Sequence, residues 1–214
     1  MKTIFTIFIV FLTISLSAVI YESAHFEDFL YGQTEATEYD NWISHIAEGI
    51  AEEGYNLYAP YDRQTNGFGD YIIPTDSLME NWSMVITEYL AGNLEAAEQL
   101  ITDFEFPYQV VVFNDLTTNQ TYYVLRENLH LDYYDDNGTP NQLDDEIGAF
   151  RYGWGLYVFN PVSENPVIVN MPHPNDDFVT PAIGYKAFKE WDARFLLISG
   201  AGREVKWTEE GSYA

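Results

Sequence analysis

The chain has 214 residues, of which 34 are acidic and 9 are basic, giving a formal net charge of −25 at pH 7. Such a polyanion repels nucleic acid and anionic lipid, which excludes both as partners. The aromatic content of 17 % is too high for a disordered chain, and the absence of cysteine excludes disulfides. The charge suits a saline medium, a cationic substrate or a bound divalent cation, and the fold must be held by its core or by metal.

Residues 1–18 have the organisation of a secretory signal peptide. Lys2 supplies the positive charge, residues 4–16 are apolar apart from hydroxyl side chains, and small residues lead to a predicted cleavage site after Ala18. The apolar run is shorter than the roughly 20 residues that span a bilayer, so a cleaved signal is favoured over a membrane anchor. We expect a secreted or periplasmic protein with one domain, residues 19–214, and no membrane association after cleavage.

Three helices are predicted in the first half of the chain. Apolar residues recur at helical spacing in each, and Thr37 and Ser77 each precede an acidic residue at capping-box spacing. The expected helices span residues 37–54, 77–92 and 93–104.

The pattern then becomes typical of strands. Residues 108–114 and 121–127 predict a hairpin, and residues 132–146 predict a polar acidic loop. Further apolar strands are expected at 153–160, 167–171 and 195–199.

A helix is predicted between the last two strands, with Thr180 as its cap and Pro181 in its first turn. Its expected buried face comprises Ile183, Ala187, Phe188 and Trp191. A strand, a helix and a strand at this spacing predict a parallel strand pair. The expected class is α/β with an α+β N-terminal part, arranged as a three-layer sandwich around a mainly parallel central sheet.

The segment VIVNMPHPNDDFVTP contains the most informative polar residues. His173, Asp176 and Asp177 follow an apolar strand and precede a helix, which is where ligands bind in open α/β sheets. Imidazole and carboxylate groups at this spacing can bind one zinc ion. The alternative is a polar loop in which an aspartate only caps the helix.

The segments GWGLYVFNP, PVIVNMPHPNDDFVTP and RFLLISGAGR, within residues 151–206, resemble bacterial zinc-dependent α/β metallohydrolases. The nearest groups are the N-formylglutamate amidohydrolase-like and zinc carboxypeptidase-like proteins. The resemblance implies that His173 is a zinc ligand, that Asp176 or Asp177 is another, and that Arg203 binds a substrate carboxylate or oxyanion. It also implies cleavage of an amide or peptide-like bond in a small-molecule or peptide substrate.

These families take a further histidine and a general-base glutamate from positions farther downstream. No histidine follows His173 in this chain. Either the site is incomplete, or the chain is the N-terminal portion of a longer hydrolase. We expect the latter, with a fold that is incomplete at its C-terminal end.

A second candidate metal site lies in the acidic segment DDNGTPNQLDDE. It resembles the Asp-rich calcium loops of thrombospondin-type repeats, with Asp136 and Asp144 as candidate ligands and Gly138 permitting the turn. A solvated acidic turn is the alternative. If calcium binds here, the alternative function is a non-catalytic secreted binding module stabilised by calcium.

Overall fold

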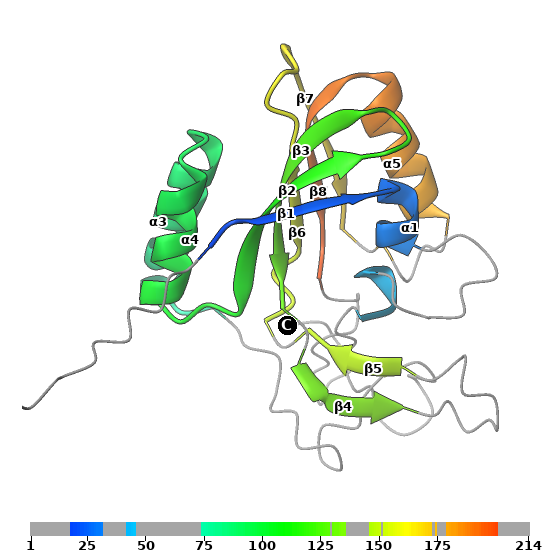
Figure 1. Cartoon of the computed structure of the whole chain (residues 1–214). Coiled ribbons are helices and arrows are strands. Elements are labelled where there is room, and N and C mark those ends of the chain that lie inside the picture. The colour runs from blue at the N-terminus through cyan, green and yellow to red at the C-terminus, as the bar shows by residue number, and fades with distance from the viewer. Residues whose placement is uncertain are drawn as a thin grey trace, which may run out of the picture.

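The computed structural model describes residues 18–31, 42–45, 74–128, 130–135, 146–150, 152–172, 174 and 179–200. Their main feature is a six-stranded mixed sheet with helices on both sides (Figure 1). Its strands are β1 (Ile20–Ala24), β2 (Tyr108–Asp115), β3 (Gln120–Glu127), β6 (Leu156–Phe159), β7 (Asn165–Met171) and β8 (Ala193–Ile198). A separate two-stranded sheet pairs β4 (His130–Asp135) with β5 (Glu146–Ala149).

The strand order of the large sheet is β1-β2-β3-β6-β8-β7. The outer pairs β1–β2 and β7–β8 are parallel, and the three pairs between them are antiparallel. The α/β class and the parallel pairing of the last two strands are confirmed. The expectation of a mainly parallel sheet is not confirmed. The short turn of residues 116–119 joins β2 to β3 and permits only antiparallel pairing of these two strands.

The helices are α1 (Phe26–Tyr31), the 3₁₀ helix η1 (Trp42–His45), α3 (Asp76–Leu90), α4 (Leu94–Asp103) and α5 (Thr180–Glu190). In Figure 1, α3 and α4 lie on one side of the sheet, and α1 and α5 lie on the other. In the described ranges, none of the helices combines the length and the apolar character that crossing a bilayer requires.

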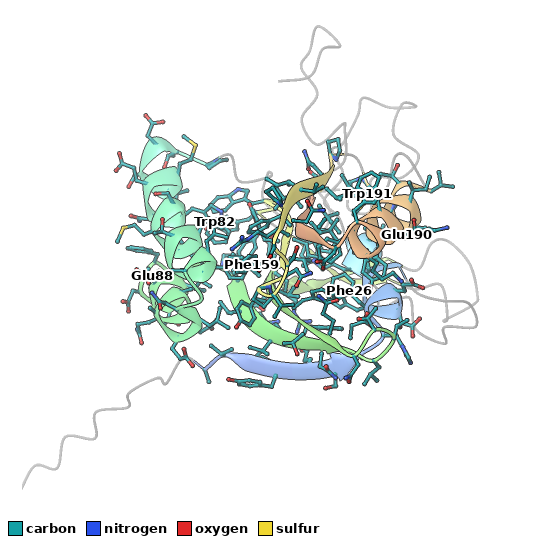
Figure 2. All side chains as sticks on the ribbon, turned by 90° about the horizontal axis from the view of Figure 1, so that it is seen from above. Phe26, Trp82, Glu88, Phe159, Glu190 and Trp191 are labelled. Carbon is teal, nitrogen blue, oxygen red and sulfur yellow. The ribbon has the colours of Figure 1, made fainter. Side chains whose placement is uncertain are left out.

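Two apolar cores result from this arrangement, because successive residues of a strand face opposite sides of the sheet. Val110 of β2 packs in the core beneath α3 and α4, whereas Val111 packs in the core beneath α1 and α5. Figure 2 shows Trp82 and Phe159 on the first side and Phe26 on the second. The Tyr89 hydroxyl fixes α3 to the sheet, because its one hydrogen is shared between the carbonyl oxygens of Tyr123 (2.7 Å) and Tyr157 (3.0 Å).

Two predicted helix caps are wrong. The cap of α3 is Thr75, whose extended backbone places its hydroxyl where it accepts a hydrogen bond from Leu78 N at 3.3 Å, while Ser77 is already inside the helix. The N-cap of α5 is Val179, which has no side-chain cap, and Thr180 is the first helical residue. Pro181 lies in the first turn as predicted.

The predicted buried face of α5 is only partly correct. Phe188 is buried, but Ile183 is 63 % exposed and Trp191 is 58 % exposed. The helix instead turns Gly184 and Tyr185 toward the sheet. A close backbone approach at Gly184 and a hydrogen bond from the Tyr185 hydroxyl set this rotation.

The N-terminal region contains a strand, β1, and a helix, α1, that the sequence pattern does not predict. β1 pairs with β2, and α1 buries Phe26 completely. Of the helix predicted at residues 37–54, the described residues include only η1, a 3₁₀ helix.

The acidic loop predicted at residues 132–146 is shorter than expected. β4 extends to Asp135 and β5 begins at Glu146, because the Tyr133–Tyr134 pair favours a strand. Residues 136–145 lie outside the described residues.

Candidate functional site at the ends of β7 and β8

The strands β7 and β8 are parallel neighbours and end at the same edge of the sheet. Met171 is paired with Ile198, and Ser199 N donates a hydrogen bond to Met171 O at 2.9 Å. The segments that follow, one toward His173 and one toward Arg203, therefore leave the sheet together.

The predicted ligands themselves lie outside the described residues. This applies to His173, Asp176 and Asp177, to Arg203, and to the candidate calcium ligands Asp136 and Asp144. Between β7 and α5 the structure describes Pro172, which is exposed, Pro174, which is buried, and Val179. The zinc and calcium sites stay predictions.

Helix α5 packs closely against the end of β7. A Cβ added to Gly184 would overlap the Sδ atom of Met171 and lie 2.9 Å from its Cγ atom. Met171 is itself buried. The last residue of β7 is thus held between β8 and the backbone of α5, which fixes where the His173 segment begins.

The start of the Arg203 segment is held by a second close contact. A Cβ on Gly200 would lie 2.8 Å from Gly153 C and 2.8 Å from Gly155 N, so only glycine fits there without a shift. A Cβ on Gly155 would overlap the carbonyl oxygen of Ile198, and Gly155 also has a positive φ of 105°. The turn before β6 and the turn after β8 are therefore packed backbone to backbone.

The turn at Tyr152–Gly155 is anchored by a buried carboxylate. Glu127, at the end of β3, accepts hydrogen bonds from Tyr152 N and Gly153 N, both at 2.7 Å. Tyrosine hydroxyls bond to the carbonyl oxygens of Trp154 (2.9 Å) and Gly155 (3.3 Å).

Aromatic rings cover this turn on the α3 side of the sheet. Trp154 lies 5.4 Å from Trp82 and 4.6 Å from Tyr152, measured between ring centroids. Trp82 also contacts Tyr108 at 4.6 Å. Sequence reasoning assigned no role to Glu127 or to this aromatic cluster, although the closely spaced aromatic and glycine residues of YGWGLY were a usable signal.

The opposite edge of the sheet holds a buried polar group that the sequence did not indicate. Asp115, fully buried at the end of β2, accepts four hydrogen bonds. Its Oδ1 atom accepts from Phe26 N (3.2 Å) and Thr117 N (3.0 Å). Its Oδ2 atom accepts from Thr118 Oγ1 (2.8 Å) and the Tyr185 hydroxyl (3.0 Å).

These contacts change the proton affinities at this edge. Burial alone would raise the pKa of Asp115, but the four donors outweigh burial and lower the pKa from its ordinary value. Burial raises the pKa of Tyr185, and the negative charge of Asp115 adds to this effect. Burial also raises the pKa of Tyr122 to about 12. Asp115 is therefore an ionised structural anchor that joins α1, the β2–β3 turn and α5.

Within the part of the chain that the structure describes, no group of three His, Asp or Glu side chains could hold a metal ion. No protein-family model, curated protein or solved structure matches the chain.

Proposed function

We propose that this chain belongs to a metal-dependent hydrolase that cleaves an amide or peptide-like bond, with its site at the edge where β7 and β8 end. The observation that supports the proposal is the parallel pairing of these strands, with Met171 opposite Ile198. This pairing starts the segments carrying His173 and Arg203 at one edge, where ligands bind in α/β sheets. The three-layer arrangement of the complete domain is part of the same proposal.

The donor set of the proposed site suits zinc. His173 supplies an imidazole, and Asp176 and Asp177 supply carboxylates, which are the groups that bind zinc in catalytic sites together with a water molecule. Zinc, when bound, polarises a carbonyl group and lowers the pKa of bound water. Arg203 would bind a substrate carboxylate through two parallel hydrogen bonds.

Metal analysis of the purified full-length protein, which would include the downstream histidine and glutamate that the resemblance implies, tests the metal site directly. We expect one zinc per chain, and loss of zinc in His173→Ala. The matched control is His25→Ala, because His25 follows β1 and bonds Thr117 at the opposite edge of the sheet. Equal zinc content in His173→Ala and the wild type would remove His173 from the site.

The anion clamp is tested on the full-length protein with N-acyl amino acids as substrates. In Arg203→Ala we expect zinc to be retained and the KM for a free carboxylate substrate to rise about tenfold to a hundredfold, since a charge-assisted pair is lost. Arg194→Ala is the control, because Arg194 lies at the start of β8, at the opposite end of the strand from the Arg203 segment, and contacts the Phe159 ring. An unchanged KM in Arg203→Ala would contradict the proposal.

One observation favours a second candidate, a calcium-stabilised binding module. β4 and β5 pair antiparallel with Asp135 opposite Glu146, which closes the segment carrying Asp136 and Asp144 at its base. If this segment binds calcium, millimolar calcium should raise the melting temperature, and Asp136→Ala with Asp144→Ala should remove the effect. Identical melting curves in calcium and in chelator would contradict it.

We also propose that the chain is exported with cleavage after Ala18. Cleavage there leaves β1, which begins at Ile20, on the mature chain. N-terminal sequencing of the exported protein should give a start within a few residues of Val19. An intact Met1 on a cytoplasmic product would contradict export.

A further inference from the structure

We infer that Glu127 is a positioning residue for the edge where β7 and β8 end. Its carboxylate fixes the position of the Tyr152–Gly155 turn. This turn then fixes the backbone at Gly200, after which the segment carrying Arg203 begins. The effect on substrate binding rests on the proposed function, whereas the backbone coupling does not.

The carboxylate of Glu127 is a buried group held by the backbone of the turn. Glu127 is only 3 % exposed, and each of its carboxylate oxygens accepts one backbone N–H of the turn. A buried carboxylate is tolerated where such donors compensate its lost hydration. Two charge-assisted bonds to consecutive residues fix both the position and the orientation of this turn.

The Tyr152–Gly155 turn is also in close contact with Gly200. The Gly200 backbone is so close to Gly153 that an added Cβ would lie 2.8 Å from Gly153 C and 2.9 Å from Gly153 O. Closely packed backbones cannot move independently, because the contact leaves no space for displacement. A shift of the turn must therefore shift Gly200, and the residues after Gly200 lead to Arg203.

The carboxylate is chemically distinct from its amide analogue at this position. In Glu127→Gln one oxygen still accepts, but the amide NH₂ group faces a backbone N–H and cannot accept from it. The substitution therefore releases one of the two anchors with little change in volume.

The chain offers a matched control in Glu98 of α4. This glutamate is 8 % exposed and accepts a hydrogen bond from Val110 N at 2.6 Å. Glu98→Gln changes the same chemical group and also weakens a bond to a buried backbone N–H, but this bond joins α4 to β2.

Amide hydrogen exchange tests the backbone coupling. In Glu127→Gln we expect Ser199 and Gly200 to exchange about tenfold faster, together with Tyr152 and Gly153, because local opening becomes easier when an anchoring bond is lost. In Glu98→Gln the same residues should exchange as in the wild type. Faster exchange at Tyr152 and Gly153 with no change at Ser199 and Gly200 would overturn the coupling.

A second variant covers the case in which Glu127→Gln does not fold. Gly200→Ala leaves Glu127 in place and introduces the Cβ that meets Gly153. Because coupling between two sites is reciprocal, exchange at Tyr152 and Gly153 should rise in this variant as well. Unchanged exchange there would overturn the inference.

A kinetic comparison separates a positioning role from general destabilisation. Glu127→Gln should raise the KM of an N-acyl amino acid, and the factor of this rise should be about ten times the factor for the methyl ester of the same compound. The ester lacks the carboxylate that Arg203 would bind. Equal effects on acid and ester would overturn the role toward Arg203. The kinetic comparison uses the full-length protein. If its wild type binds no zinc and hydrolyses neither compound, the proposed function fails, while the exchange result still decides the backbone coupling.

Discussion

The sharpest test of the packing is a comparison of two substitutions at Asp115. Asp115→Ala removes an acceptor that four donors share, whereas Asp115→Asn preserves the shape of the group. In the asparagine variant the Oδ1 atom can still accept from Phe26 N and Thr117 N. The two hydroxyl groups near the former Oδ2 atom can rotate and accept from the new NH₂ group, because hydroxyls both donate and accept.

The contacts give the expected magnitudes. Two of the four hydrogen bonds, from Phe26 N and from the Tyr185 hydroxyl, are buried. An unpaired buried donor costs about 1–3 kcal/mol, so Asp115→Ala should lose about 4 kcal/mol of unfolding free energy. Asp115→Asn loses only the share due to the charge, about 1–2 kcal/mol.

The pH dependence follows from the lowered pKa of Asp115, which the four donors cause against the opposing effect of burial. The folded state binds this proton less tightly than the unfolded state. The stabilisation by the carboxylate is therefore complete above an unfolded pKa of about 3.9 and is lost as the pH falls through the lower folded-state pKa. The difference in stability between the wild type and Asp115→Asn should therefore shrink in acid.

Urea denaturation at neutral pH and at about pH 3 measures these differences. Asp103→Asn is the control, because Asp103 bonds only the neighbouring Gln99 side chain in an exposed pair, and it should change stability by less than about 0.5 kcal/mol. The reasoning is refuted if the asparagine variant is as unstable as the alanine variant, or if its deficit is the same at both pH values.

Three further stability measurements test individual contacts. Thr75→Ala should cost about 1 kcal/mol through loss of the α3 cap, and Ser77→Ala should cost much less; the reverse order would restore Ser77 as the cap. Gly184→Ala should lower the unfolding free energy by about 1–3 kcal/mol, because the new Cβ overlaps Met171. In the double variant with Met171→Ala this overlap is relieved, so the combined loss should be smaller than the sum of the two single losses. Additive losses would refute the contact. Trp42→Phe should lower the unfolding free energy by less than about 1 kcal/mol, because it removes an Nε1 atom that is buried without a hydrogen-bond partner. In the described ranges this is the only such side-chain atom. A loss as large as that of deleting a buried ring would contradict the expectation.

The elements that sequence reasoning predicted well are those whose signal is local. The β2–β3 hairpin and α4 match their predicted ranges within about one residue, and the parallel pairing of β7 and β8 follows from the helix between them. β1 was missed because its partner β2 begins 84 residues after it ends, so no short pattern reports the pairing.

The orientation of α5 shows a different limit. Ile183 and Trp191 fit an apolar stripe at helical spacing, and yet the helix buries Gly184 and Tyr185. The closest approach to the sheet is set by the smallest residue, and the tyrosine hydroxyl finds its acceptor on β2. The spacing of apolar residues along a helix does not say how closely the helix approaches the sheet or which hydrogen bonds its side chains form. The rotation of α5 could therefore not be predicted.

The residues of the candidate site also differ in whether the sequence could predict them. The motif that contains His173 could be read from the sequence because its residues are adjacent. Glu127 could not, since the amides it accepts from lie 25 and 26 residues farther along the chain. Only the folded structure brings Glu127, the Tyr152–Gly155 turn and Gly200 into one group.

The two ends of the sheet hold their polar groups differently, and this difference separates folding from function. At one end, Asp115 joins three elements of the core, so a change there should loosen the fold as a whole. At the other end, Glu127 anchors a turn that contacts Gly200, so a change there should act on the segment carrying Arg203. If Asp115→Asn and Glu127→Gln are compared at equal loss of unfolding free energy, set with urea, only Glu127→Gln should speed exchange at Ser199 and Gly200, where this segment begins. Equal acceleration in both variants would mean that this segment reports only global stability.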